Sequence, residues 1–175
     1  MGAPLSTWRA TVLGIGIVIF VTVGSQMPFD RLVQAMDEYA ATTSVQVFAQ
    51  IGNTNFRPKA MQWATLLDPA AYRRLFSDSS LVISHAGMGT IISAAEAGKP
   101  LVVMPRRGHL KETRNDHQVA TAKWLSGRAG IYVAEEAEDL KQLVSRIEQS
   151  ACPPAAIPKS APEEFIAAIR AFIAP

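Results

Sequence analysis

The sequence contains little from which a disulfide-bonded or metal-bound scaffold could be built. Among its 175 residues the only cysteine is Cys152, so neither an intrachain disulfide nor a cysteine-based zinc site can form. The three histidines, His85, His109 and His117, lack the spacing of a helical zinc pair. We therefore expect a reducing, cytoplasmic setting and no metal.

Charge and the common nucleotide-binding motifs are also scarce. Charged residues make up 18% of the chain, and the formal net charge of +2 is too small to indicate a nucleic-acid partner. No GxxxxGK[ST] phosphate loop occurs, and no GxGxxG follows a strand. A DxD pair and a GxSxG elbow are absent as well. The sequence therefore lacks the usual signatures of P-loop proteins, dinucleotide-binding enzymes, metal–nucleotide sites and serine hydrolases.

The longest apolar run lies near the N-terminus, between Val12 and Val23. It is shorter than the roughly 20 residues that are needed to cross a bilayer. It leads into VGSQMPFD without the small-residue cleavage site of a signal peptide. We expect residues 17–23 to be the first buried strand and residues 1–16 to be an N-terminal extension.

Apolar residues are plentiful, at 49% of the chain, and short β-branched runs alternate with helical patterns. Strands are expected over residues 17–23, 45–51, 81–84, 101–105 and 131–134, and helices over about 28–40, 69–77, 91–98, 115–125 and 136–149. This alternation predicts an α/β fold, a single Rossmann-like parallel sheet over residues 17–150 with helices on both faces. A proline-rich linker, 151–162, then precedes a C-terminal segment, 163–175, whose amphipathic helix should dock on the domain or on a partner.

The stretch LVISHAGMGTII, residues 81–92, leads from an apolar strand through a small-residue loop into a helix. Backbone N–H groups at such a helix start carry partial positive charge, so the loop suits a phosphate or a diphosphate. A tight turn whose glycines only reverse the chain is the alternative. Ligands of parallel sheets bind beyond the carboxyl ends of the strands. At that edge three loops should gather: residues 24–26, 85–90 and 105–118.

Three segments carry a resemblance to a known family: IFVTVGSQMPFDRLV, LVISHAGMGTIISAAEAGKPLVVMPR and ETRNDHQVATAKWL. In this order and spacing they resemble the C-terminal, donor-binding half of GT-B glycosyltransferases, of the family 28 C-terminal type. The resemblance is closest to two small, separately encoded subunits. One is the soluble subunit of the dolichol-pathway UDP-N-acetylglucosamine transferase, and the other is the PssE-type subunit of bacterial exopolysaccharide synthesis.

The resemblance implies that the glycine loops hold the diphosphate of a UDP-sugar and that the NDHQ segment touches the ribose or the donor sugar. The implied substrate-binding residues are Gly24, Ser25, Gln26, Gly87, Met88, Gly89, Thr90, Asn115, Asp116, His117 and Gln118. For Asn115 and Asp116, an N-cap of the following helix is an equal alternative. Many relatives have a ribose-binding glutamate where this chain has Ser93. Either Glu96, one turn later, reaches the ribose, or the ribose is held otherwise.

Three further residues are candidates for the site. His85 either ties the strand to the loop or faces the phosphate or the donor sugar, and it is the candidate catalytic residue. A guanidinium pairs bidentately with a carboxylate. Arg106 and Arg107 would therefore suit a uronic acid donor such as UDP-glucuronic acid, the alternative being contact with phosphate or solvent.

The function implied is that of the donor-binding, catalytic subunit of an inverting, metal-independent glycosyltransferase. It would transfer a sugar from a UDP-sugar to a polyprenyl-diphosphate-linked saccharide during exopolysaccharide synthesis, at the inner face of the cytoplasmic membrane. Since the sequence shows no acceptor-binding half, we expect a membrane-anchored acceptor-binding partner subunit and no cofactor. The main alternative is a non-catalytic nucleotide-sugar-binding or enhancer subunit. A weaker one is another phosphate-ligand enzyme, such as a sugar epimerase.

Overall fold

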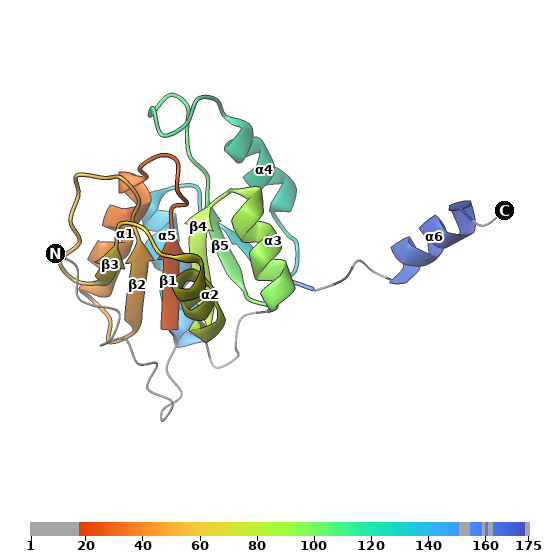
Figure 1. Cartoon of the computed structure of the whole chain (residues 1–175), viewed down its shortest axis with the longest axis horizontal. Coiled ribbons are helices and arrows are strands. Elements are labelled where there is room, and N and C mark those ends of the chain that lie inside the picture. Colours follow the sequence, from red (N-terminus) through yellow and green to blue (C-terminus); the bar gives the residue numbers. More distant parts are fainter. Residues whose placement is uncertain (1–17, 151–154, 159, 161–162, 174–175) are drawn as a thin grey trace.

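The computed structural model describes residues 18–150, 155–158, 160 and 163–173, so the predicted extension over residues 1–16 lies outside it. Six parallel strands form one sheet with the order β3-β2-β1-β4-β5-β6 (Figure 1). They are β1 (Val18–Thr22), β2 (Gln46–Gln50), β3 (Gln62–Ala64), β4 (Leu81–His85), β5 (Leu101–Met104) and β6 (Ile131–Val133). The predicted single parallel sheet is therefore confirmed.

Helices cover both faces of the sheet. The helices of the first face are α1 (Asp30–Ala40) and α5 (Ala137–Gln149), and those of the second are α2 (Pro69–Asp78), α3 (Met88–Ala97) and α4 (His117–Leu125). Because successive side chains of a strand point to opposite faces, each strand contributes to two cores. In β1, Ile19 and Val21 belong to the first core and Phe20 belongs to the second.

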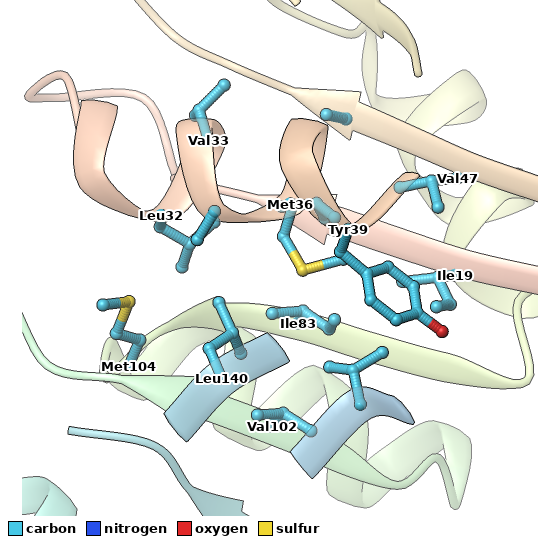
Figure 2. Close-up of a cluster of buried hydrophobic side chains, with 14 of the residues drawn as sticks. Ile19, Leu32, Val33, Met36, Tyr39, Val47, Ile83, Val102, Met104 and Leu140 are labelled. Atoms are coloured by element: carbon cyan, nitrogen blue, oxygen red, sulfur yellow. The ribbon is translucent and has the colours of Figure 1, made fainter. Parts of the chain in front are cut away.

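The first core fixes the position of α1 and therefore of the loop before it. Figure 2 shows Leu32 and Met36 of α1 directed toward the sheet, with Ile83 of β4 and Leu140 of α5 beneath them. All four side chains have no exposed surface. Burial of a side chain of this size contributes about 1.5–3 kcal/mol, so these contacts hold α1 firmly against the strands.

The ends of the helices follow from particular residues. The carboxylate of Asp68 accepts hydrogen bonds of 2.9 Å from the N–H groups of Ala70 and Ala71 at the start of α2. Helix α3 ends at Gly98, which has a left-handed φ of 62°. It begins at Met88, three residues before the predicted start at Ile91, because the glycine loop itself forms the first helical turn.

Part of the predicted linker packs against the domain. Ile157 is buried in the second core, and the N–H of Ala155 donates to the Tyr132 hydroxyl at 3.1 Å. Gly130 makes room for this segment, since a Cβ there would meet the backbone of Ala156 and Ile157. The described part of residues 151–162 is thus a packed connection at the edge of the sheet.

Helix α6 (Glu163–Ile173) lies in the predicted C-terminal segment and stands apart from the sheet in Figure 1. Of its large apolar residues, Ile169 and Ile173 are exposed, whereas the side chains of Phe165 and Phe172 lie outside the described residues. The structure therefore does not show this helix docking on its own domain. None of the described helices combines the length and the apolarity that a membrane crossing requires.

Candidate functional site

A cavity of about 590 Å³ opens at the carboxyl edge of the sheet, where the three predicted loops gather. Its size is within the range of small-molecule sites. It is lined by Thr22, Val23, Gly24, Ser25, Gln26, Met27, Gln50, Tyr72, His85, Gly87, Met88, Gly89, Thr90, Ser93, Arg106, Thr113, His117 and Gln118. All the predicted site residues except Arg107, Asn115 and Asp116 are among them.

The start of α3 presents backbone donors to this cavity. Gly87 is the N-cap residue, and no side chain in the described part of the chain caps the helix, so the N–H groups of the first turn are left for a ligand. Met88, Gly89 and Thr90 of that turn line the cavity. A Cβ placed on Gly89 would meet nothing within 4 Å. The glycine therefore keeps space open rather than avoiding a neighbour.

The imidazole of His85 lies between the two glycine loops. A Cβ on Gly24 would lie 2.9 Å from its Cε1, and one on Gly87 would lie 2.9 Å from Cδ2 and Cε1 and closer still to Nε2. The φ of Gly87 is −98°, which any residue can adopt. The histidine ring, rather than the backbone conformation, is thus what requires glycine at position 87.

His85 is a neutral side chain at physiological pH. Burial lowers the pKa of His85 to about 4, with further lowering by the charges of Arg106 and His117 and a smaller opposing effect of the Thr22 backbone. Among the described residues, no partner reaches its buried Nδ1 with good hydrogen-bond geometry. A neutral imidazole carries one donor and one acceptor, so His85 can donate to a phosphate oxygen without bringing a charge.

Arg106 connects the two outer loops of the site. Nη2 donates to the carbonyls of Val23 and Met27, both at 2.7 Å, and Nη1 donates at 3.1 Å to those of Pro28 and Glu112. The guanidinium lies 5.1 Å from the ring of Phe29, and the residue is 4% exposed. Its terminal nitrogens are therefore engaged, which contradicts the predicted bidentate contact with a sugar carboxylate.

Arg107 points away from the cavity. Its Nη1 pairs with Glu136 at 2.6 Å, and its Nη2 donates to the Glu135 carbonyl at 3.2 Å. Its backbone N–H donates to Glu112, which also pairs with Arg31 at 2.8 Å. These bonds stabilise the loop, and Arg107 is not among the residues that line the cavity, so its contact with substrate stays a prediction.

The NDHQ segment divides into a supporting half and a lining half. Asp116 precedes α4, but its carboxylate accepts from the N–H of Gly108 at 2.7 Å instead of capping the helix. The side-chain oxygen of Asn115 accepts from the N–H of His117 at 3.3 Å and also contacts His117 Nδ1. Only His117 and Gln118 line the cavity. Asn115 thus orients the His117 ring, and neither Asn115 nor Asp116 is placed for the predicted direct contact.

No carboxylate is found among the described residues that line the cavity. Ser93 lines the cavity, whereas Glu96 is exposed on α3 and does not. Within the described residues no group of three His, Cys, Asp or Glu side chains could hold a metal ion. With the charge of Arg106 beside the helix start, the lining suits an anion.

Sequence reasoning missed several lining residues, among them Thr22, Gln50 and Tyr72. Thr22 and Gln50 each end an apolar strand with a polar side chain, and these two strands are neighbours in the sheet. That pattern was available in the sequence. Tyr72 gave no such signal, because an aromatic residue on an amphipathic helix is typical of a core.

Comparisons with known proteins agree on the fold. The chain is 34% identical over 125 residues to the human UDP-N-acetylglucosamine transferase subunit ALG13, which covers 65% of this chain and 11% of the human protein. The matched part of this chain thus spans about a tenth of the length of the human protein. The solution structure of ALG13 has a TM-score of 0.57 at 18% identity, covering 86% of this chain and 94% of that one. A crystal structure of the glycotransferase of kitacinnamycin has a TM-score of 0.61 at 20% identity, covering 86% of this chain and 40% of the other.

The family assignment rests on a longer match. The model of the glycosyltransferase family 28 C-terminal domain matches residues 18–171, which include every strand and helix described above except the last two residues of α6. The chain therefore belongs to the glycosyltransferase family 28 C-terminal domain family.

Proposed function

We propose that this chain binds a UDP-sugar and is the donor-binding, catalytic subunit of an inverting, metal-independent glycosyltransferase. One observation carries the proposal. The uncapped start of α3, the glycine loop after β1 and the buried charge of Arg106 meet at one cavity, whose described lining has no carboxylate. A diphosphate fits such a place because backbone donors and a fixed cation face it without a competing negative charge.

These groups would act on the leaving group. As an acceptor hydroxyl attacks the anomeric carbon of the donor sugar, the bond from that carbon to the diphosphate oxygen breaks and negative charge grows on UDP. The N–H groups of α3 and the neutral His85, which line the cavity, would donate to that oxygen, and fixed donors need no reorganisation during the step. We assign removal of the acceptor proton to the partner, since the described lining offers no carboxylate and His85 is enclosed by the glycine loops.

The partner and the acceptor complete the proposal. We propose a membrane-anchored, acceptor-binding subunit that contacts α6, where Ile169 and Ile173 are exposed. The acceptor would be a polyprenyl-diphosphate-linked saccharide in exopolysaccharide synthesis, at the inner face of the cytoplasmic membrane. Support for a two-subunit arrangement comes from the human relative, which is itself named a transferase subunit. No lining residue offers two free guanidinium N–H groups side by side, so a uronic acid donor is not part of the proposed function.

Nucleotide binding is the first test. Calorimetry of the full chain, alone and with its partner, should show binding of UDP in preference to ADP and GDP. The complex should transfer sugar from a UDP-sugar to a lipid-linked acceptor without added divalent cations. Absence of UDP binding in both forms would refute the proposal. If Gln118→Ala lowers the UDP affinity of the chain but leaves kcat/KM of the complex for the UDP-sugar unchanged, the chain is instead a non-catalytic subunit.

A second test concerns α6. Deletion of residues 162–175 should abolish co-purification with the acceptor subunit and leave the UDP affinity of the remaining chain unchanged, because the helix lies apart from the cavity. The Ser145→Ala variant, a surface change on α5, is the matched control and should co-purify normally. Undiminished association of the truncated chain would reject α6 as the docking element.

A further inference from the structure

The two ends of the cavity differ in charge. The cavity crosses the carboxyl ends of neighbouring strands in the order β2, β1, β4 and β5. At the β5 end lie the guanidinium of Arg106, which is positively charged, and the imidazole of His117. At the β2 end Gln50, Thr22 and Tyr72 line the cavity, and none of them is charged at neutral pH. The start of α3, with its backbone donors, lies between these ends.

The side-chain amide of Gln50 has a fixed orientation. Its Oε1 accepts a hydrogen bond of 2.7 Å from the hydroxyl of Thr22, and the same hydroxyl oxygen accepts from the N–H of Gly24 at 3.3 Å. The amide group Nε2 must therefore face the other way. Gln50 is only 6% exposed, and its remaining surface belongs to the cavity lining. No hydrogen bond to an acceptor in the described part of the chain uses the Nε2 hydrogens, so a ligand in the cavity can reach this donor.

Tyr72 and Thr90 complete this end of the cavity. The ring of Tyr72 packs edge-on against Phe20 with 5.4 Å between centroids, which holds the residue in place. Burial raises the pKa of Tyr72, and the nearby hydroxyls of Thr90 and Thr22 partly offset that effect. The Tyr72 hydroxyl is therefore protonated at neutral pH. Together these groups offer neutral hydrogen bonds and no charge.

The burial of this end indicates which part of a donor it takes. Thr22, Gln50 and Thr90 are 1%, 6% and 7% exposed. At the other end Arg106 and Gln118 are as buried, at 4% and 6% exposed, but His117 at the start of α4 is exposed to solvent. A transferred sugar must be accessible to the acceptor, whereas the rest of a nucleotide sugar can be enclosed. With the diphosphate at the start of α3, the enclosed β2 end is left for the nucleoside, whose pentose follows the phosphate directly.

We infer that the β2 end of the cavity is a neutral pentose subsite in which Gln50 Nε2 donates a hydrogen bond to a pentose hydroxyl oxygen. The inference rests on the proposed function and adds a specificity-determining residue to it. In such a subsite amide and hydroxyl groups recognise the hydroxyls of the ribose. No carboxylate is needed, which agrees with a serine at position 93 and with Glu96 lying outside the cavity lining.

Calorimetry with UDP, 2′-deoxy-UDP and 3′-deoxy-UDP tests this inference on the full chain. The natural protein should bind one of the deoxy analogues about three- to tenfold more weakly than UDP, as expected for one neutral hydrogen bond. Gln50→Leu should bind UDP weaker by a similar factor and should not distinguish UDP from that analogue. Gln46→Leu, the same change at the exposed beginning of β2, should behave as the natural protein.

The outcomes separate the two proposals. Equal discrimination by Gln50→Leu and the natural protein would overturn the role of Gln50 while leaving UDP binding intact. Failure of the natural protein and its complex to bind UDP at all would instead refute the proposed function. If circular dichroism shows that Gln50→Leu does not fold, the Thr22→Val/Gln50→Leu variant replaces both hydrogen-bonding partners and provides the same comparison.

Discussion

A methyl group added at Gly87 should destabilise the protein, whereas one added at Gly89 should not. A Cβ on Gly87 would lie 2.9 Å or less from three atoms of the His85 ring. That ring is flanked on its other side by Gly24, where a Cβ would also lie 2.9 Å from Cε1. The imidazole therefore has little room to move away. A Cβ on Gly89 would meet nothing within 4 Å.

Gly87→Ala and Gly89→Ala should change the free energy of unfolding by different amounts. Overpacking of an enclosed side chain costs about 1–3 kcal/mol, so Gly87→Ala should lower the free energy of unfolding by about 2 kcal/mol. Gly89 lies in the first turn of α3, where alanine is favoured over glycine by up to about 1 kcal/mol. Gly89→Ala should therefore leave the free energy of unfolding unchanged or raise it slightly. Since its methyl group would occupy the cavity, UDP affinity should fall at least about tenfold, or about 1.4 kcal/mol.

Urea unfolding followed by circular dichroism measures the first effect, and calorimetry with UDP measures the second. The His85→Ala/Gly87→Ala double variant serves as the control, because removing the ring should remove most of the additional cost of the methyl group. An equal loss of stability for Gly87→Ala in the presence and absence of His85 would refute the steric reasoning. Undiminished UDP affinity of Gly89→Ala would show that the space beside Gly89 is not used by the nucleotide.

Two further predictions concern the groups around His85. Arg106→Met leaves four backbone carbonyls without their donor, so the free energy of unfolding, measured with urea, should fall by about 3 kcal/mol. Arg106→Lys should recover part of this loss. An unchanged value for Arg106→Met would show that the loops do not depend on the guanidinium. The pKa of His85 is about 4 in the folded chain against an ordinary 6.5, so the unfolded chain takes up the proton first on acidification. The free energy of unfolding should therefore fall by about 3 kcal/mol at most as the pH drops from 6.5 toward 4. In the same unfolding assay, His85→Gln should lack this pH-dependent loss. Identical pH profiles of His85→Gln and the natural protein would contradict the prediction.

The fold could be predicted from sequence because its signals are local and repeated. Runs such as LVIS and LVVM are almost continuously apolar, which is typical of strands buried on both faces. The helix between these two runs ends at the stop signal Gly98-Lys99-Pro100. The short strand β3 could not be located in this way, since Gln62–Ala64 has neither a long apolar run nor alternation. Its pairing depends on contacts with β2, which only the folded sheet provides.

Sequence could predict only those site residues whose place at the end of a strand or the start of a helix already brings them to the cavity. The glycine loops and His117-Gln118 line the cavity because they follow strand ends or begin a helix at the ligand edge. Arginines 106 and 107 are adjacent in sequence, yet one is buried among carbonyls and the other pairs with Glu136 on the surface. A sequence does not show which carbonyls or carboxylates a long side chain will reach. Only the folded arrangement identified Arg106 as the connection between the two loops.

The central position of β1 has a consequence for how the chain is made. Of the described strands β1 is synthesised first, and its partner on one side, β2, follows soon after. On the other side, the N–H of Val18 donates to the hydroxyl of Ser80, which is synthesised 62 residues later. Until that segment leaves the ribosome, one edge of a buried apolar strand remains unpaired, and such edges recruit other chains. Substitutions that delay the arrival of β4 would therefore reduce the yield of soluble protein even where the finished domain tolerates them.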